Sequence, residues 1–238
     1  EMTQVSLQTP TRHADSAFAL MGDMVVRPAF AEEELARERT SRLQALRQQK
    51  DQPTIIASQT FDRLVYGAGH PYGHPANGTL QTIEAMSRAD VTGFYDTWYR
   101  PNNAVLIVVG DVSPAQAAAL ATSAFGRWAP KPVPAAAAAI PATPALKATA
   151  VYLVDKPGAA QSEIRIGHPL AARSMSPDYS ALRVLNTALG GAFTSRVNLN
   201  IREAKGYTYG ARTVMTFTRG AGPFVASAGV FTAKPDSS

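Results

Sequence analysis

The chain has 238 residues, of which 45% are hydrophobic and 17% are charged. A hydrophobic share of this size supports a folded core and argues against an intrinsically disordered chain. The formal net charge is +5, from 23 basic and 18 acidic residues. Because the basic residues are scattered and form no long run, the charge pattern favours a mildly basic surface over a nucleic-acid interface.

Cysteine is absent from the sequence, which excludes disulfides, thiolate zinc sites, iron–sulfur clusters and a cysteine nucleophile. The same absence fits a bacterial-type soluble protein of either the periplasm or the cytoplasm, so the compartment stays open. No apolar stretch approaches the roughly 20 residues that span a bilayer, and we expect no membrane span. No signal-peptide pattern follows Glu1, so we expect a processed or truncated chain.

A stretch rich in proline and alanine divides the chain. Residues 129–150 contain five prolines, which lack backbone donors and favour extended conformations, so we expect a semi-rigid linker there. The linker separates a first segment, residues 1–128, from a second segment, residues 151–238. Each segment is at the small end for an independent domain.

The first segment is predicted to be mainly helical. Apolar spacing and N-cap signals predict, in chain order, a strand at 5–8, helices at 15–26, 32–49 and from residue 53, a loop at 67–78, a helix at 91–99, a buried strand at 103–109 and a helix at 114–125. Ser87 with Asp90 is typical of a capping box. Ser113 with Pro114 is typical of an N-cap and the first helical turn.

The second segment mixes strands and helices. It is predicted to form strands at 151–154 and 163–168, helices at 177–189 and 194–203, and a hairpin from the runs 207–218 and 223–231. Neither segment has a strict strand–helix–strand rhythm. The pattern therefore predicts an α+β fold, with helices packed on mainly antiparallel sheets.

The four histidines are His13, His70, His74 and His168. His70 and His74 have the i, i+4 spacing of a helical zinc site, but the intervening Pro-Tyr-Gly disfavours a helix. We therefore favour a loop with structural hydrogen bonds over a metal site. His13 and His168 are predicted to be cap, turn or surface residues.

Several well-known catalytic and phosphate-binding motifs are missing from the sequence. It contains neither HExxH nor HxxEH, no GxSxG nucleophile elbow and no GxxxxGK[ST] loop. Gly190 and Gly191 precede Ser195, where a helix N-terminus would suit an anion. A plain helix-to-helix turn is the favoured interpretation of these glycines.

The run from Arg202 to Tyr209 carries the strongest candidates for a binding site. Arg202 is predicted near a helix end, Gly206 at a turn and Tyr209 on the next strand. A guanidinium and a phenol at such a corner both donate hydrogen bonds to a carbonyl oxygen or a developing oxyanion. From spacing alone, we favour a surface ion pair for Arg202 and a core-capping role for Tyr209.

Three regions in fixed order carry further information. They are His70–Gly73 followed by Gly78, the run from Asp90 through Tyr99-Arg100-Pro101-Asn102-Asn103 to Val112, and the run from Leu189-Gly190-Gly191 to Tyr209. Together they resemble the insulinase/pitrilysin family of zinc metallopeptidases, in particular the mitochondrial-processing-peptidase-like branch. The resemblance covers essentially the whole chain.

This resemblance implies a chain built from paired homologous α+β domains. Residues 1–128 would be the later half of a first peptidase-like domain, and residues 151–238 the earlier half of a second, both truncated. The zinc-binding HxxEH element of the family would then lie before Glu1.

The resemblance also indicates where the family's third zinc ligand and its substrate-binding pair should lie. The third ligand is a glutamate seven residues beyond another glutamate on one helix, and here Glu38 is followed seven residues later by Ala45. Alanine cannot ligate zinc, so no cofactor is expected on this chain, and zinc is expected in an active partner or an upstream segment. The family's substrate-binding arginine and tyrosine match Arg202 and Tyr209.

The resemblance therefore implies a non-catalytic portion or subunit of an insulinase-like metallopeptidase, inactive alone. It would bind a peptide or unfolded protein through Arg202 and Tyr209, for proteolysis by a zinc-bearing homologous subunit. Two alternatives stay open. One is a fragment of an active zinc metalloendopeptidase whose HxxEH motif lies upstream of Glu1, and the other is a structural core-type protein without a peptidase role.

Overall fold

The computed structural model describes residues 2–134, 140–146, 148–170, 176–233 and 235. These residues have the α+β architecture predicted from the sequence. The chain divides into two compact units, Glu1–Ser41 with Glu84–Ala138 and Arg42–Ile83 with Ala139–Ser238. The predicted division into two homologous segments and a linker stays a prediction, and linker residues 135–139 and 147 lie outside the described residues.

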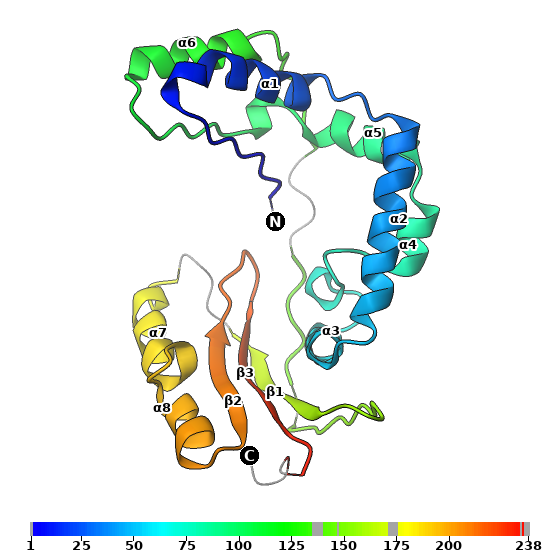
Figure 1. Ribbon diagram of the computed structural model, residues 1–238, viewed down its shortest axis with the longest axis vertical. Coiled ribbons are helices and arrows are strands. Elements are labelled where there is room, and N and C mark those ends of the chain that lie inside the picture. Colours follow the sequence, from blue (N-terminus) through cyan, green and yellow to red (C-terminus); the bar gives the residue numbers. More distant parts are fainter. Residues whose placement is uncertain (1, 135–139, 147, 171–175, 234, 236–238) are drawn as a thin grey trace. The chain divides into compact units, whose positions relative to one another are not determined.

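The regular structure described in the first unit is helical. Its elements are η1 (Thr11–His13), α1 (Ala14–Val26), α5 (Arg88–Trp98), η3 (Pro101–Asn103) and α6 (Pro114–Phe125), while α2 (Glu32–Gln49) and α4 (Leu80–Ala85) contribute residues to both units. Helix α1 packs along α6 (Figure 1). Gly22 permits this approach, because a Cβ there would lie 2.7 Å from the carbonyl oxygen of Ala124.

The two N-cap signals predicted in the first unit, at Ser87 and Ser113, are confirmed. Ser87 Oγ accepts the Asp90 N–H, and the Asp90 carboxylate accepts the Ser87 N–H at 2.8 Å, which makes the capping box of α5. Ser113 and Gln116 form the equivalent box of α6. Each box satisfies backbone donors that the first helical turn leaves without intrahelical partners, so these starts are encoded locally.

The second unit combines helices with a three-stranded sheet. Its elements are α3 (Pro53–Tyr66), η2 (Pro71–Gly73), β1 (Gln161–Pro169), α7 (Tyr179–Asn186), η4 (Thr187–Gly191), α8 (Arg196–Asn198), η5 (Leu199–Ala204), β2 (Thr208–Met215) and β3 (Pro223–Phe231). The strand order is β1-β3-β2, and both pairs are antiparallel. The β2–β3 pair confirms the predicted hairpin.

The two faces of the sheet carry different kinds of side chains. One face carries the core of buried residues, with Ala211, Ala228 and Val230 packed against Ile164, Val197 and Ile201. Figure 1 shows α7 and α8 beside β2. Because side chains alternate along a strand, the other face carries Glu163 and Arg165 of β1 and Ser227 of β3.

Three predicted strands are wrong. Residues 5–8, 104–109 and 151–154 have no regular secondary structure. The segment around Ile107 is not buried, since 79% of this residue is exposed. A strand needs a neighbouring strand for its backbone groups, and the described residues form a single sheet, made of β1, β2 and β3.

The helices of the second unit differ in detail from the prediction. The helix expected at 177–189 begins at Tyr179 and passes into the π-helical η4, and the helix expected at 194–203 begins at Arg196 and passes into the π-helical η5. Single-sequence periodicity does not distinguish α from π turns. Within the described residues, every helix is too short or too polar to cross a membrane.

Candidate functional site

Arg202 and Tyr209 flank the turn between η5 and β2. Gly206 makes this turn with a φ of 63°, in the left-handed region that favours glycine. The Tyr207 N–H donates to the Ile201 carbonyl at 3.0 Å, which fastens the turn. Since η5 also packs against β2, the helix-to-strand corner predicted from the sequence is present.

The Arg202 side chain is held by two neighbours. Its Nη1 donates to Glu203 Oε1 at 2.5 Å, and its guanidinium carbon lies 4.4 Å from the centre of the Phe193 ring. The ion pair agrees with the interpretation made from spacing. The cation–π contact adds a second restraint on the guanidinium, and 32% of the side chain stays exposed.

Tyr209 projects from β2 with 82% of the residue exposed. Its ring meets Phe231 edge-on, with 6.1 Å between the ring centres. This exposure contradicts a core-capping role and leaves the phenol hydroxyl accessible. Among the contacts of the described residues there is no hydrogen bond that joins Arg202 to Tyr209, so each side chain is positioned separately.

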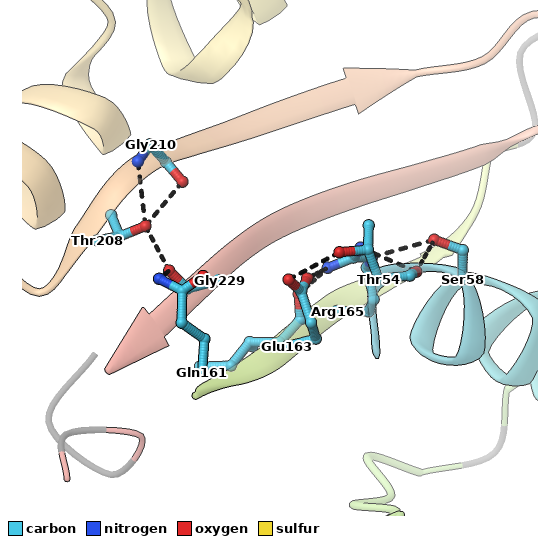
Figure 2. A network of polar contacts seen from close by, with 9 residues as sticks. Thr54, Ser58, Gln161, Glu163, Arg165, Thr208, Gly210 and Gly229 are labelled. Carbon is cyan, nitrogen blue, oxygen red and sulfur yellow. Dashed lines mark hydrogen bonds and ion pairs between the residues drawn. The ribbon is translucent and has the colours of Figure 1, made fainter. Parts of the chain in front are cut away.

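A bulge in β2 sets the direction of Tyr209. The pairing of β2 with β3 shifts register just after Thr208. The Thr208 hydroxyl donates to the Gly229 carbonyl at 2.6 Å and accepts the Gly210 N–H at 3.1 Å (Figure 2). Gln161 Nε2 donates to the same Gly229 carbonyl at 3.3 Å. Bulges re-aim side chains, so Thr208 is a positioning residue that the sequence analysis missed.

A hollow of about 450 Å³ lies on the sheet of the second unit. We call it the sheet-face hollow, and its lining includes Thr54, Glu163, Arg165, Phe193, Arg212 and Gly229. Helix α3 supplies Thr54, the three strands supply most of the lining, and the segment after η4 supplies Phe193. Because Arg202 lies over Phe193, the hollow borders the corner that carries Arg202.

A nearly buried ion pair forms one wall of the sheet-face hollow. Arg165 Nη1 lies 2.9 Å from Glu163 Oε2, and the two side chains are only 9% and 15% exposed. Thr54 Oγ1 donates to Glu163 Oε1 at 2.9 Å, and Arg165 also reaches the Thr54 carbonyl and the Ser58 hydroxyl (Figure 2). The pair therefore fastens β1 to α3, and removal of one partner would leave a buried charge.

The outer edge of β2 is occupied by asparagine side chains. Asn198 Oδ1 accepts the Ala211 N–H at 3.0 Å, and Asn186 Nδ2 donates to the Thr213 carbonyl at 3.2 Å. These amides take the place that a further strand would fill. Gly190 and Gly191, the last residues of η4, lie against the same strand, since a Cβ on Gly190 would lie 2.4 Å from the Thr213 nitrogen. The interpretation of these glycines as part of a helix-to-helix connection, rather than an anion site, stays a prediction.

The His70 loop has the structural hydrogen bonds that the sequence analysis favoured. His70 is buried, its Nδ1 accepts the Tyr72 N–H at 3.1 Å, and its Nε2 lies 3.0 Å from the Pro141 carbonyl. His74 Nε2 pairs with the Ala68 carbonyl. His13 and His168 are exposed, as predicted.

The described residues do not fit a zinc ion. They contain no group of three or more His, Asp or Glu side chains arranged to hold a metal. Ala45 lies exposed on α2, and Glu38 on the same helix pairs with Arg37 at 3.0 Å. The expectation that zinc belongs to a partner or an upstream segment stays a prediction.

Comparison with known proteins identifies a matching protein family and several similar proteins. The model of the peptidase M16 inactive domain matches residues 85–237. An uncharacterised zinc protease of Mycobacterium leprae is 29% identical over 195 residues, which is 81% of this chain and 43% of that protein. One of Streptomyces coelicolor is 28% identical over 206 residues, which is 86% of this chain and 44% of that protein. The chain thus spans less than half the length of these curated relatives.

Solved structures show the same fold. The peptidase M16 inactive domain of Pseudomonas fluorescens superposes with a TM-score of 0.83 at 27% identity, over 93% of this chain and 52% of that chain. A protease of Helicobacter pylori superposes with a TM-score of 0.81 at 22% identity, over 93% of this chain and 54% of that chain. At that lower identity the likeness concerns the fold alone.

Proposed function

This chain belongs to the peptidase M16 family, and from that premise we propose that it is a non-catalytic part of an M16 peptidase that binds unfolded peptide. In this proposal the zinc and the bond cleavage belong to a homologous partner or to a segment that precedes Glu1. The match to the inactive-domain model supports the non-catalytic assignment. So does the methyl group of Ala45, which stands where the family resemblance expects a carboxylate ligand.

The corner between η5 and β2 is the observation that carries the proposal. It presents the Arg202 guanidinium and the Tyr209 phenol, one on each side of the Gly206 turn, with the phenol almost fully exposed. Both groups donate hydrogen bonds, and the carbonyl oxygens of an extended peptide are acceptors. The proposed role of the pair is therefore to hold the main chain of a substrate, without a proton-transfer step on this chain.

Peptide binding by the purified chain tests the proposal. We expect the chain to bind short, unstructured, fluorescently labelled peptides in an anisotropy titration. Arg202→Gln should weaken binding about tenfold, because it removes the charged guanidinium donor group, and Tyr209→Phe about fivefold, because it removes the phenol donor. Arg183→Gln on the exposed surface of α7 and Tyr152→Phe are matched controls that should bind as the unaltered chain does.

Two results would contradict the proposal. Unchanged binding by both Arg202→Gln and Tyr209→Phe would leave the corner without a role and would favour a structural protein. Peptide cleavage by the chain alone, together with one tightly held zinc per chain in elemental analysis, would show that this chain is catalytic.

A further inference from the structure

Two arginines of the sheet-face hollow lie at positions of β1 and β2 that pair with the same residue of β3. Ser227 of β3 pairs with Arg165 of β1 on one side and with Arg212 of β2 on the other. Residues directly opposite one another on neighbouring strands point to the same face. Arg165 and Arg212 therefore flank the Ser227 hydroxyl from the two outer strands, and all three face the hollow.

The two arginines differ in their partners. The Arg165 guanidinium forms an ion pair with Glu163 and donates hydrogen bonds to the Thr54 carbonyl and the Ser58 hydroxyl. The Arg212 side chain has no hydrogen bond or ion pair within the part of the chain that the structure describes. One guanidinium in the hollow thus has all five of its donors free for a ligand.

The charge of the hollow is unbalanced. Its lining holds one carboxylate, from Glu163, and two guanidiniums, from Arg165 and Arg212. The two oxygens of this carboxylate are already bound, Oε2 by Arg165 and Oε1 by Thr54, and no ion pair joins it to Arg212 within the described residues. One positive charge therefore remains uncompensated.

The lining of the hollow leaves room for a side chain of a bound peptide. Gly210 and Gly229 contribute no side-chain bulk to the lining, and Phe193 stands at one side. The Phe193 ring also lies under the Arg202 guanidinium. A peptide held by Arg202 would therefore pass beside the hollow and place a neighbouring side chain near it.

We propose that the sheet-face hollow is a subsite for an acidic side chain of the bound peptide, with Arg212 as the residue that recognises its carboxylate. The inference rests on the proposed peptide-binding function and assigns it a substrate preference. A planar guanidinium binds a carboxylate through two parallel hydrogen bonds, which is stronger and more directional than an amide contact. The subsite therefore discriminates glutamate from glutamine in the same peptide.

Pairs of unstructured peptides that differ only by Glu or Gln at one position test this inference. The substituted position is moved along the peptide from pair to pair, and affinity is measured by anisotropy at low salt. We expect at least one position at which the Glu peptide binds about tenfold more tightly than its Gln partner. The preference should shrink as salt is raised, because exposed charges are screened.

Arg212→Gln should abolish this preference, by lowering the affinity for the Glu peptides to about that for their Gln partners. Arg183→Gln, which removes an exposed arginine outside the hollow, should keep the preference. Circular dichroism of Arg212→Gln should match the unaltered chain, since the Arg212 side chain has no described partner to lose.

The outcomes separate the two proposals. Equal affinity for Glu and Gln at every position, with binding still lost in Arg202→Gln, overturns the acidic subsite and leaves the peptide-binding function standing. A Glu preference that survives Arg212→Gln also overturns the subsite. Absence of binding for every peptide overturns both.

Discussion

At the scale of single residues, the aromatic cluster of Tyr66, His70 and Tyr72 shows how side chains tie distant loops together. The Tyr66 and His70 rings stack with 5.0 Å between their centres, and Tyr66 also meets Tyr72 edge-on. The Tyr66 hydroxyl donates to the Ala221 carbonyl at 3.0 Å. The cluster therefore joins the end of α3 to the loop between β2 and β3.

Tyr66 makes the stability of the fold depend on pH in the alkaline range. Burial, with smaller contributions from Asp62 and Tyr72, raises the pKa of Tyr66 to about 12. An unfolded tyrosine titrates near pH 10, so stability from this group is complete below about pH 10 and falls as the pH rises toward 12. Tyr66→Phe should cost about 1 kcal/mol below pH 10, through the lost hydrogen bond.

Urea unfolding of both proteins across the alkaline range measures this effect. The free energy of unfolding should fall more steeply with pH for the unaltered chain than for Tyr66→Phe. Tyr95, whose pKa burial also raises, is present in both proteins and cancels in the comparison. Identical pH slopes would show that Tyr66 does not carry the effect.

Residue-level prediction from the sequence succeeded where the signal was local. The Pro-Tyr-Gly between His70 and His74 indicated a hydrogen-bonded loop, and the structure has it. The network around Thr208 and the free guanidinium of Arg212 were missed. Both depend on which residues of β2 and β3 lie opposite each other, and single-sequence periodicity does not fix strand register.

At the scale of elements, Gly190 is required by the approach of η4 to β2. A Cβ on Gly190 would lie 2.4 Å from both the Thr213 nitrogen and its Oγ1. Gly190→Ala should therefore destabilise the chain by about 1–3 kcal/mol, the usual range for overpacking. Thermal or urea unfolding measures the change.

Gly93 provides the matched control for this substitution. It is an exposed glycine within α5, and a Cβ there would have no neighbour within 4 Å. Gly93→Ala should stabilise the chain by about 0.5–1 kcal/mol, because alanine loses less conformational freedom in a helix. An equal effect of the two substitutions would contradict the packing explanation for Gly190.

Elements with their own start signals were predicted well, and elements that need a partner were not. The helix capped by Ser113 begins at Pro114 as predicted, and the helix capped by Ser87 begins at Arg88, three residues before the predicted start. The apolar runs at 104–109 and 151–154 have strand composition, but no strand beside them in the described residues. Composition reports the preference of a segment, whereas pairing supplies its hydrogen bonds.

At the scale of the whole molecule, the exposed apolar runs are a liability in solution. Val105, Ile107 and Val109 are each at least 79% exposed. Ile107→Lys should change the free energy of unfolding by less than about 0.5 kcal/mol, because the side chain has little packing to lose. It should also reduce aggregation on heating, measured by light scattering, because a charge interrupts the apolar run.

A buried residue of the same unit gives the contrast. Leu120 on α6 is buried, so Leu120→Lys should lower the unfolding temperature strongly, as a buried unpaired charge does. If Ile107→Lys were as damaging as Leu120→Lys, the run at 104–109 would be packed in solution rather than exposed.

The two asparagines on the outer side of β2 limit how copies of this chain can associate. Their amides already satisfy the Ala211 donor and the Thr213 acceptor. A second molecule that tried to extend the sheet there would first have to displace both side chains. The two amides therefore disfavour edge-to-edge pairing through β2, and this protection holds only while both remain intact.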